Sequence, residues 1–275
     1  MLRKWLWLCA GIVSLVTPCV TRAQESYLDV YTVKVKADKS VEFNSLSKKW
    51  VEANRANGGD RWVTLESVYG EADQYVFIST RSSYADIDKA NESTMAAAAK
   101  AFGPDMGKLM QDFESTLISS RADLRRRRWD LSRKAPADAA GIAKLIGQTR
   151  VVRITAVRVK PGHQAEFEAL LKDMKAAGEK NSNTQPVLVS QGVEGYRGIV
   201  YYISTLRTSL AGFDNNPSIQ DLLGEDGYKK WLQVNADAVD EVSSSLYRVN
   251  AELSNPADDI AAIATDFWHP KAATK

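Results

Sequence analysis

Arginine supplies the densest group of chemically capable side chains in this sequence. Residues 125–128 are four consecutive arginines, and a guanidinium group binds carboxylate or phosphate through paired hydrogen bonds. In a strand, side chains alternate between two faces, so Arg126 and Arg128 would share one face. An internal repeat places Arg248 at the position equivalent to Arg126. Arg158 lies on the polar face of another expected strand. These arginines predict a site for a small anion, with an internal salt network to acids such as Asp130 as the alternative.

Aromatic side chains form a second group of candidates. Trp62, Tyr69 and Tyr202 lie in expected strands, where each offers an apolar ring with a polar tip to a cavity. A cofactor-independent oxygenase needs a pocket of this kind for an oxidisable aromatic substrate. Ordinary core packing is the alternative for each residue.

The sequence lacks the motifs of most other chemistries. It contains no Gly-x-Ser-x-Gly elbow, no phosphate-binding glycine loop and no dinucleotide fingerprint. The two histidines, His163 and His269, are far apart and have no metal-ligand spacing. We therefore assign no catalytic residue, no metal and no cofactor, and whether the protein is an enzyme stays open.

The first 23 residues predict a secretory signal peptide. Arg3 and Lys4 precede an uncharged apolar run, and Thr21-Arg22-Ala23 places small residues before a cut at Gln24. An uncleaved anchor helix and lipidation of Cys19 are the alternatives. We expect export to the periplasm or beyond the cell.

Cleavage would change the composition in two ways. Both cysteines of the chain, Cys9 and Cys19, would leave with the signal, which excludes disulfides and thiolate chemistry. Three of the 36 basic residues and none of the 34 acidic residues would also leave, so the net charge would change from +2 to −1. This balance gives no electrostatic case for nucleic-acid binding. No later apolar stretch is long enough to cross a bilayer, so we expect no stable membrane insertion.

An internal repeat organises the rest of the chain. Val33-Lys34-Val35-Lys36 resembles Val157-Arg158-Val159-Lys160, and Phe43 and Phe167 follow at the same offset. The repeat predicts two units, 24–132 and 149–255, with a linker at 133–148 and a tail at 256–275. Such self-similarity is typical of proteins built from repeated units.

Hydrophobic periodicity predicts the same element order in each unit. In the first unit we expect strands at 30–36, 62–69, 74–80 and 124–131, a helix that Asn57-Gly58-Gly59 ends, and a helical region at 95–119. In the second we expect strands within 149–160, 187–206 and 245–253, and helices at 163–180 and 226–242. The order βαββαβ is that of a ferredoxin-like unit. We therefore predict an α+β protein in which two tandem ferredoxin-like units form a pseudo-dimeric α/β barrel.

The turn Lys160-Pro161-Gly162-His163, followed by Glu166-Phe167 and Leu170-Leu171, resembles the opening of dimeric α/β-barrel domains, which include the antibiotic-biosynthesis-monooxygenase-like group. In the first unit, Lys36-Ala37-Asp38-Lys39 replaces the Pro-Gly turn. The resemblance implies a fold shared by cofactor-free monooxygenases, haem-degrading enzymes and haem-dependent chlorite dismutases. The haem enzymes need an axial histidine facing a pocket, and neither histidine of this chain supplies one convincingly.

We expect an exported protein that binds a small anionic or aromatic ligand inside the barrel. The expected ligand site comprises Arg126, Arg158, Arg248, Tyr202, Trp62 and Tyr69. The alternatives are a cofactor-independent monooxygenase-like enzyme and a structural or interaction module with a filled barrel. The expected assembly is a monomer or a homodimer.

Overall fold

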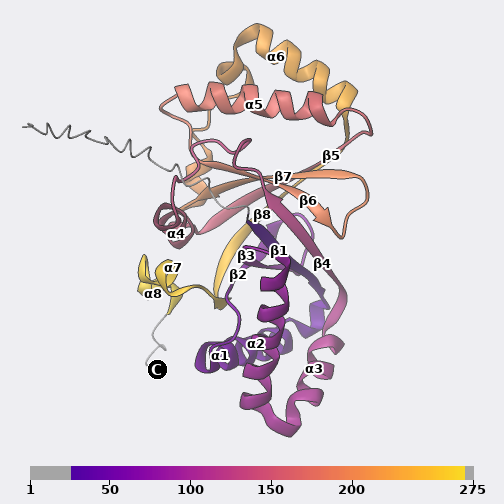
Figure 1. Cartoon of the computed structure of the whole chain (residues 1–275), viewed down its shortest axis with the longest axis vertical. Helices are drawn as coiled ribbons and strands as arrows, with labels where there is room; N and C mark the ends of the chain where they lie inside the picture. Colours follow the sequence, from indigo (N-terminus) through magenta and orange to yellow (C-terminus); the bar gives the residue numbers. More distant parts are fainter. Residues whose placement is uncertain (1–25, 270–275) are drawn as a thin grey trace, which may run out of the picture.

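Eight antiparallel strands close into one barrel in the order β1-β3-β2-β8-β5-β7-β6-β4 (Figure 1). The computed structural model describes residues 26–269. The predicted signal peptide, 1–23, lies outside the described residues, as does the end of the predicted tail, 270–275. The order places β4, β1, β3 and β2 side by side, and likewise β8, β5, β7 and β6. The β2–β8 and β4–β6 pairs join these two groups.

The first half of the described chain carries four strands and three α-helices. These are β1 (Tyr27–Val35), α1 (Ser40–Asn57), β2 (Trp62–Tyr69), β3 (Gln74–Arg81), α2 (Tyr84–Phe102), α3 (Met106–Ser115) and β4 (Leu117–Arg127). The second half carries α4 (Ala139–Gln148), β5 (Val151–Val159), α5 (Gln164–Lys180), β6 (Val187–Glu194), β7 (Ile199–Arg207), α6 (Ile219–Ala238) and β8 (Val239–Asn255). Two short helices follow, α7 (Asp258–Ala262) and α8 (Thr265–Trp268).

Local sequence explains several element ends. Gly58 ends α1 in the left-handed conformation, at φ 69°, which glycine adopts without steric cost. Ser83 accepts a hydrogen bond from the Asp86 amide at the start of α2. Ser218 and Asp221 form a reciprocal capping box at the start of α6.

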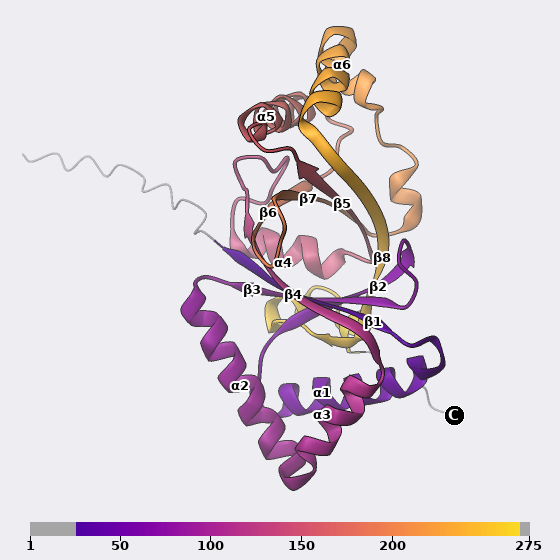
Figure 2. The ribbon, with the colours of Figure 1, turned by 90° about the vertical axis from the view of Figure 1, so that its right-hand side faces the viewer.

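The outer face of the barrel packs against helices on two sides. Figure 2 shows α1, α2 and α3 on one side and α5 and α6 on the other. On the first side, Phe43 of α1 packs against Val33, Val35 and Tyr75. On the second, Phe167 of α5 packs against Val157 and Tyr201. One face of these strands therefore packs on the helices, and the opposite face lines the barrel interior.

Several predicted boundaries were wrong, including the starts of α2 at Tyr84 and of α6 at Ile219, which were expected at 95 and 226. Helix α3 ends at Ser115 and β4 begins at Leu117, whereas we expected a helix to 119 and a strand from 124. Strand β8 begins at Val239, where we expected helix up to 242, and runs for 17 residues. Both early segments are polar yet pair along neighbouring strands, β4 with β1 and β8 with β5. The predicted linker, 133–148, contains α4.

The start of the predicted tail docks on the barrel. Trp268 of α8 is 1% exposed and belongs to a core cluster with Val152, Tyr247 and Val249. Its indole Nε1 donates to the carbonyl of Gly147 at 3.1 Å. Helices α4, α7 and α8 therefore pack together beside the barrel.

Candidate functional site

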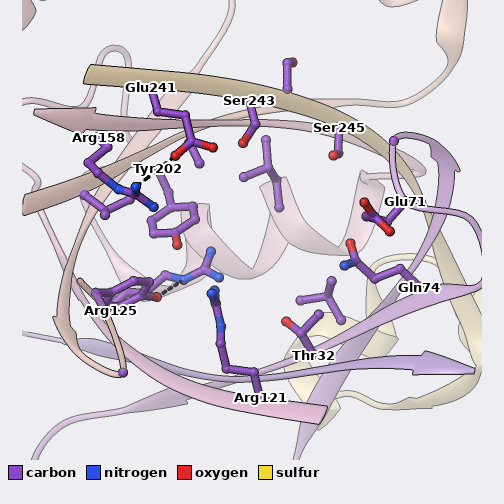
Figure 3. Close-up of a pocket in the computed structure, with 18 of the residues that line it drawn as sticks. Thr32, Glu71, Gln74, Arg121, Arg125, Arg158, Tyr202, Glu241, Ser243 and Ser245 are labelled. Carbon is purple, nitrogen blue, oxygen red and sulfur yellow. Dashed lines mark hydrogen bonds and ion pairs between the residues drawn. The ribbon is translucent and has the colours of Figure 1, made fainter. Parts of the chain in front are cut away.

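A polar cavity of about 680 Å³ occupies one end of the barrel interior (Figure 3). Its rim is open to solvent, because Glu241 and Ser243 of β8 are exposed. Its wall includes Thr32, Glu71, Gln74, Arg121, Arg125, Arg158, Tyr196, Arg197, Tyr202, Glu241 and Tyr247. The volume lies within the range of small-molecule sites.

Strand β4 supplies the charged centre of this cavity. Arg121 and Arg125 line it, and the alternation of a strand places Asp123 on the same face. The side chain of Asp123 is fully buried, with both arginines bonded to it: Arg125 Nε lies 2.7 Å from Oδ1, and Arg121 Nη2 lies 3.0 Å from Oδ2. The hydroxyl of Tyr196 donates to the same carboxylate. One buried acid thus fixes two arginines and a tyrosine.

Arg125 also stacks on an aromatic ring. Its guanidinium carbon lies 3.6 Å from the centroid of the Tyr202 ring, a cation–π geometry. Burial alone would lower the pKa of Arg125, but Asp123, Tyr196 and Tyr202 raise it above its usual value. Burial raises the pKa of Tyr196 as well, so its phenol stays protonated. At neutral pH the cavity therefore presents a charged guanidinium group and a neutral phenol.

Strand β5 contributes Arg158 to the cavity. Its Nη1 lies 3.0 Å from Glu241 and 4.0 Å from Asp240, both of β8. Its Nε is buried and has no hydrogen-bond partner. Figure 3 shows Arg158, Tyr202, Arg125 and Arg121 gathered at one side of the cavity, with Glu71 and Gln74 at the other.

The cavity carries a small excess of positive charge once the buried Asp123 behind its lining is counted. Four arginines line it, against the two glutamates Glu71 and Glu241. Glu71 is engaged by Lys34 at 2.6 Å, and Glu241 by Arg158. The acids form the salt network that the sequence offered as an alternative. Even so, each guanidinium has five donors, and these acids occupy only some of them.

The structure brings together only part of the predicted site. Arg158 and Tyr202 line the polar cavity. Arg126 does not, because in β4 the odd-numbered arginines face inward; its Nε is buried without a partner. Arg248 is exposed on the outer side of β8, and Tyr69 is 69% exposed at the end of β2. Trp62 lies elsewhere, with its indole donating to the carbonyl of Leu253 at 2.8 Å.

Sequence reasoning missed the residues at the centre of the site. Arg121, Asp123 and Arg125 alternate along one strand face, and that spacing was the available signal. The prediction followed the arginine run instead. Arg128 at its end faces α5, where its Nη1 lies 2.6 Å from Glu168.

Further cavities lie among the residues that the structure describes, and two of them are mostly apolar. An apolar one of about 390 Å³ lies at the other end of the barrel interior, and Ile154 is the one lining residue that it shares with the polar cavity. An aromatic one of about 320 Å³ lies between the barrel and the first helices, lined by Tyr31, Ser47, Trp50, Trp62, Phe77, Thr94, Met110, Phe113 and Glu114. The Ser47 hydroxyl is buried there without a hydrogen-bond partner.

Residues 26–269 contain neither a metal-binding cluster nor a membrane-spanning helix. Within this range no three histidine, cysteine or acidic side chains are grouped so that they would hold a metal ion. The Nδ1 of His163 lies 2.9 Å from Glu166 on an exposed turn. In the same range, no helix combines the length and apolarity needed to span a membrane.

Several solved structures are similar to this chain. An anthrone oxidase-like protein matches with a TM-score of 0.53 and 14% identity, over 84% of this chain and 93% of its own. A putative monooxygenase from Fusobacterium nucleatum matches with a TM-score of 0.50 and 12% identity, over 83% and 94%. Chlorite dismutase from Candidatus Nitrospira defluvii matches with a TM-score of 0.46 and 11% identity, over 90% and 98%.

At these identities the similarity shows the fold alone. No protein-family model matches the chain, and no curated protein is similar to it in sequence. The predicted resemblance is confirmed at the level of the fold: the chain has the architecture of the dimeric α/β-barrel proteins.

Proposed function

We propose that this protein binds a small organic anion in the polar cavity of its barrel. One observation carries the proposal: Arg121, Arg125 and Arg158 converge on one cavity. The two glutamates of its lining are already paired, Glu71 with Lys34 and Glu241 with Arg158. A bound carboxylate would accept the donors that Asp123 and Glu241 leave free. The size of the cavity, about 680 Å³, favours a ligand over a barrel filled by its own side chains.

The aromatic lining narrows the class of ligand. Tyr196 and Tyr202 lie with ring centroids 5.6 Å apart beside the guanidinium groups. An aromatic carboxylate would place its ring against these tyrosines and its charge against Arg121 and Arg158. We use phthalate as the aromatic probe and citrate as the non-aromatic one.

The organisation of the chain forms part of the proposal. We infer that 24–132 and 149–255 are two ferredoxin-like units in tandem, because each contributes four neighbouring strands to the barrel. Export rests on the sequence of residues 1–23 alone. A monomer or a homodimer remains the expected assembly.

Two measurements test anion binding. Native mass spectrometry with an absorbance spectrum, on the chain purified after export, would detect a co-purifying ligand and the oligomeric state. Titration calorimetry would then measure phthalate and citrate. Arg121→Gln and Arg158→Gln should each weaken phthalate binding about tenfold, or about 1.4 kcal/mol. Arg153→Gln is the matched control, because Arg153 lies on β5 with Arg158 but on its outer face, over Phe213. Equal affinity in all three variants would overturn the proposal.

The aromatic cavity supports a second candidate function, a cofactor-independent oxygenase. Five aromatic rings surround the buried Ser47 hydroxyl, which has no hydrogen-bond partner. This arrangement suits an apolar aromatic substrate with one polar atom. In the simplest balanced reaction, an activated methylene and O₂ give a carbonyl and water, so the substrate supplies all four electrons.

Anthrone is a suitable probe of this alternative, because its oxidation to anthraquinone changes its absorbance. The oxygenase function predicts consumption of one O₂ per anthraquinone formed and a slower reaction in Ser47→Ala. Arg158→Gln should leave that rate unchanged, because Arg158 lines the other cavity. A rate equal to that of the protein-free solution would exclude anthrone oxidation.

A further inference from the structure

The apolar cavity at the other end of the barrel has a lining suited to a hydrocarbon chain. Eleven aliphatic side chains of leucine, isoleucine and valine surround about 390 Å³: Leu28, Val63, Leu65, Ile78, Ile146, Val152, Ile154, Leu188, Leu206, Val249 and Ile260. At roughly 30 Å³ for each water-sized group, the space holds about a dozen heavy atoms. Ile146 of α4 and Ile260 of α7 lie over this end of the barrel.

One cation in this cavity lacks an acidic partner. Arg127 of β4 lines the cavity, and within residues 26–269 no carboxylate lies within ion-pair distance of it. Its guanidinium carbon lies 5.2 Å from the centroid of the Trp129 ring. Burial lowers the pKa of Arg127 to about 10, and no acid offsets that effect. A half-buried cation without a counterion favours an anion from outside the chain.

The other charges of the cavity are already paired. Arg81 lies 2.6 Å from Asp60 and 3.1 Å from Asp29. Arg61 lies 3.3 Å from Asp258. Asp60, the one carboxylate that lines the cavity, is therefore committed to Arg81 and not to Arg127. The lining therefore suits a ligand with an apolar chain and one anionic group, which Arg127 would bind.

We propose that this second cavity binds a medium-chain aliphatic carboxylate, with the carboxylate on Arg127 and the chain among the aliphatic residues. The site is separate from the polar cavity, since its cation is Arg127 rather than Arg121, Arg125 or Arg158. The two cavities should also differ in the ligands that they select. The polar cavity suits a compact or aromatic anion, whereas the apolar cavity suits a chain of about ten carbons.

Decanoate and decan-1-ol test the proposal in the full chain, because they differ only in the charged head. Titration calorimetry should show one decanoate per chain and at least tenfold weaker binding of the alcohol. Arg127→Gln should weaken decanoate at least tenfold and leave decan-1-ol unchanged. Arg126→Gln is the matched control, because it is the next residue of the same strand and faces away from the cavity.

A second set of measurements identifies the cavity without relying on Arg127. Val152→Phe, which fills the apolar cavity, should weaken decanoate and decan-1-ol alike. Arg158→Gln and saturating phthalate should leave decanoate binding unchanged. If Val152→Phe fails to fold, Leu188→Phe replaces it, because Leu188 lines this cavity and neither the polar nor the aromatic one.

Three outcomes would overturn the proposal. One is the absence of saturable decanoate binding. Another is equal affinity for decanoate and decan-1-ol, or for the native chain and Arg127→Gln. The third is displacement of decanoate by phthalate, which would place it in the polar cavity. The first two leave the proposed anion site in the polar cavity untouched, because phthalate binding tests that site separately.

Discussion

Arg125 Nε lies 2.7 Å from Oδ1 of Asp123, and neither side chain is more than 7% exposed. This pair is the buried electrostatic centre of the barrel. A carboxylate removed from water is stable only with a partner, because its hydration is otherwise lost. The same pair holds the guanidinium group over the Tyr202 ring. Asp123 is therefore a positioning residue for the cavity wall.

Loss of one member of this pair should destabilise the protein strongly. Arg125→Met would leave the Asp123 carboxylate buried with Arg121, 56% exposed, as its remaining ion-pair partner. We expect the free energy of unfolding to fall by about 3–5 kcal/mol, measured by urea denaturation. The double variant Asp123→Asn/Arg125→Met should recover part of that loss. A single variant as stable as the native chain would show that Arg121 and Tyr196 suffice.

Arg127→Met, two residues further along the same strand, should not lower the unfolding free energy as Arg125→Met does. Arg127 has no acidic partner within residues 26–269 and lines the apolar cavity. Replacing it with an apolar side chain removes a desolvated charge, so the unfolding free energy should stay unchanged or rise. The same change should weaken decanoate binding at least tenfold. Urea denaturation of both methionine variants separates the structural arginine from the ligand-binding one.

Stability should also depend on pH through Glu168. Hydrogen bonds from Arg128, with smaller contributions from Tyr201 and Gln164, lower the pKa of Glu168 from 4.5 to about 2 despite partial burial. Below about pH 4.5 the unfolded chain binds a proton at this position that the folded chain does not bind. The stabilisation is therefore complete above pH 4.5 and is lost as the pH falls towards 2.

Glu168→Gln should flatten this part of the pH profile. Urea denaturation at intervals between pH 5 and pH 2.5 should show a shallower decline than in the native chain. Glu166→Gln is the control, because Glu166 is exposed and contacts His163 rather than Arg128. A Glu168→Gln profile parallel to that of the native chain would contradict the assignment.

The predictable parts of the fold are those that face helices. Strands β2 and β3 and the end of helix α1 were expected almost to the residue, because apolar and polar side chains alternate in the strands and Gly58 marks the helix end. The first halves of β4 and β8 were missed. Their sequences, Ile118-Ser119-Ser120-Arg121 and Val242-Ser243-Ser244-Ser245, border a polar, solvent-reached interior. A strand that is polar on both faces lacks the alternation that identifies strands.

The candidate site was likewise predictable only where apolar neighbours mark the face of a strand. Arg158 was placed correctly because its neighbours Val157 and Val159 pack on α5 and define the strand's apolar face. The arginine run of β4 offers one such marker, Leu124, which is buried. The prediction relied instead on the repeat, which pairs Arg126 with Arg248; both lie outside the polar cavity. The repeat therefore identified equivalent positions but not the face on which they lie.

The docked end of the chain yields the last prediction. Trp268 is 1% exposed, belongs to the core cluster that includes Val152 and Val249, and donates to the Gly147 carbonyl. Trp268→Ala should lower the unfolding free energy by about 3–5 kcal/mol, because it removes a large buried side chain and leaves a cavity. Trp268→Phe, which keeps most of the buried area but loses the hydrogen bond, should cost less. Val152 and Val249 also line the apolar cavity, so Trp268→Ala should weaken decanoate binding by loosening the wall of that cavity. Urea denaturation measures the unfolding free energy, and calorimetry measures the decanoate affinity. An unaltered unfolding free energy in Trp268→Ala would show that α8 does not contribute to the core.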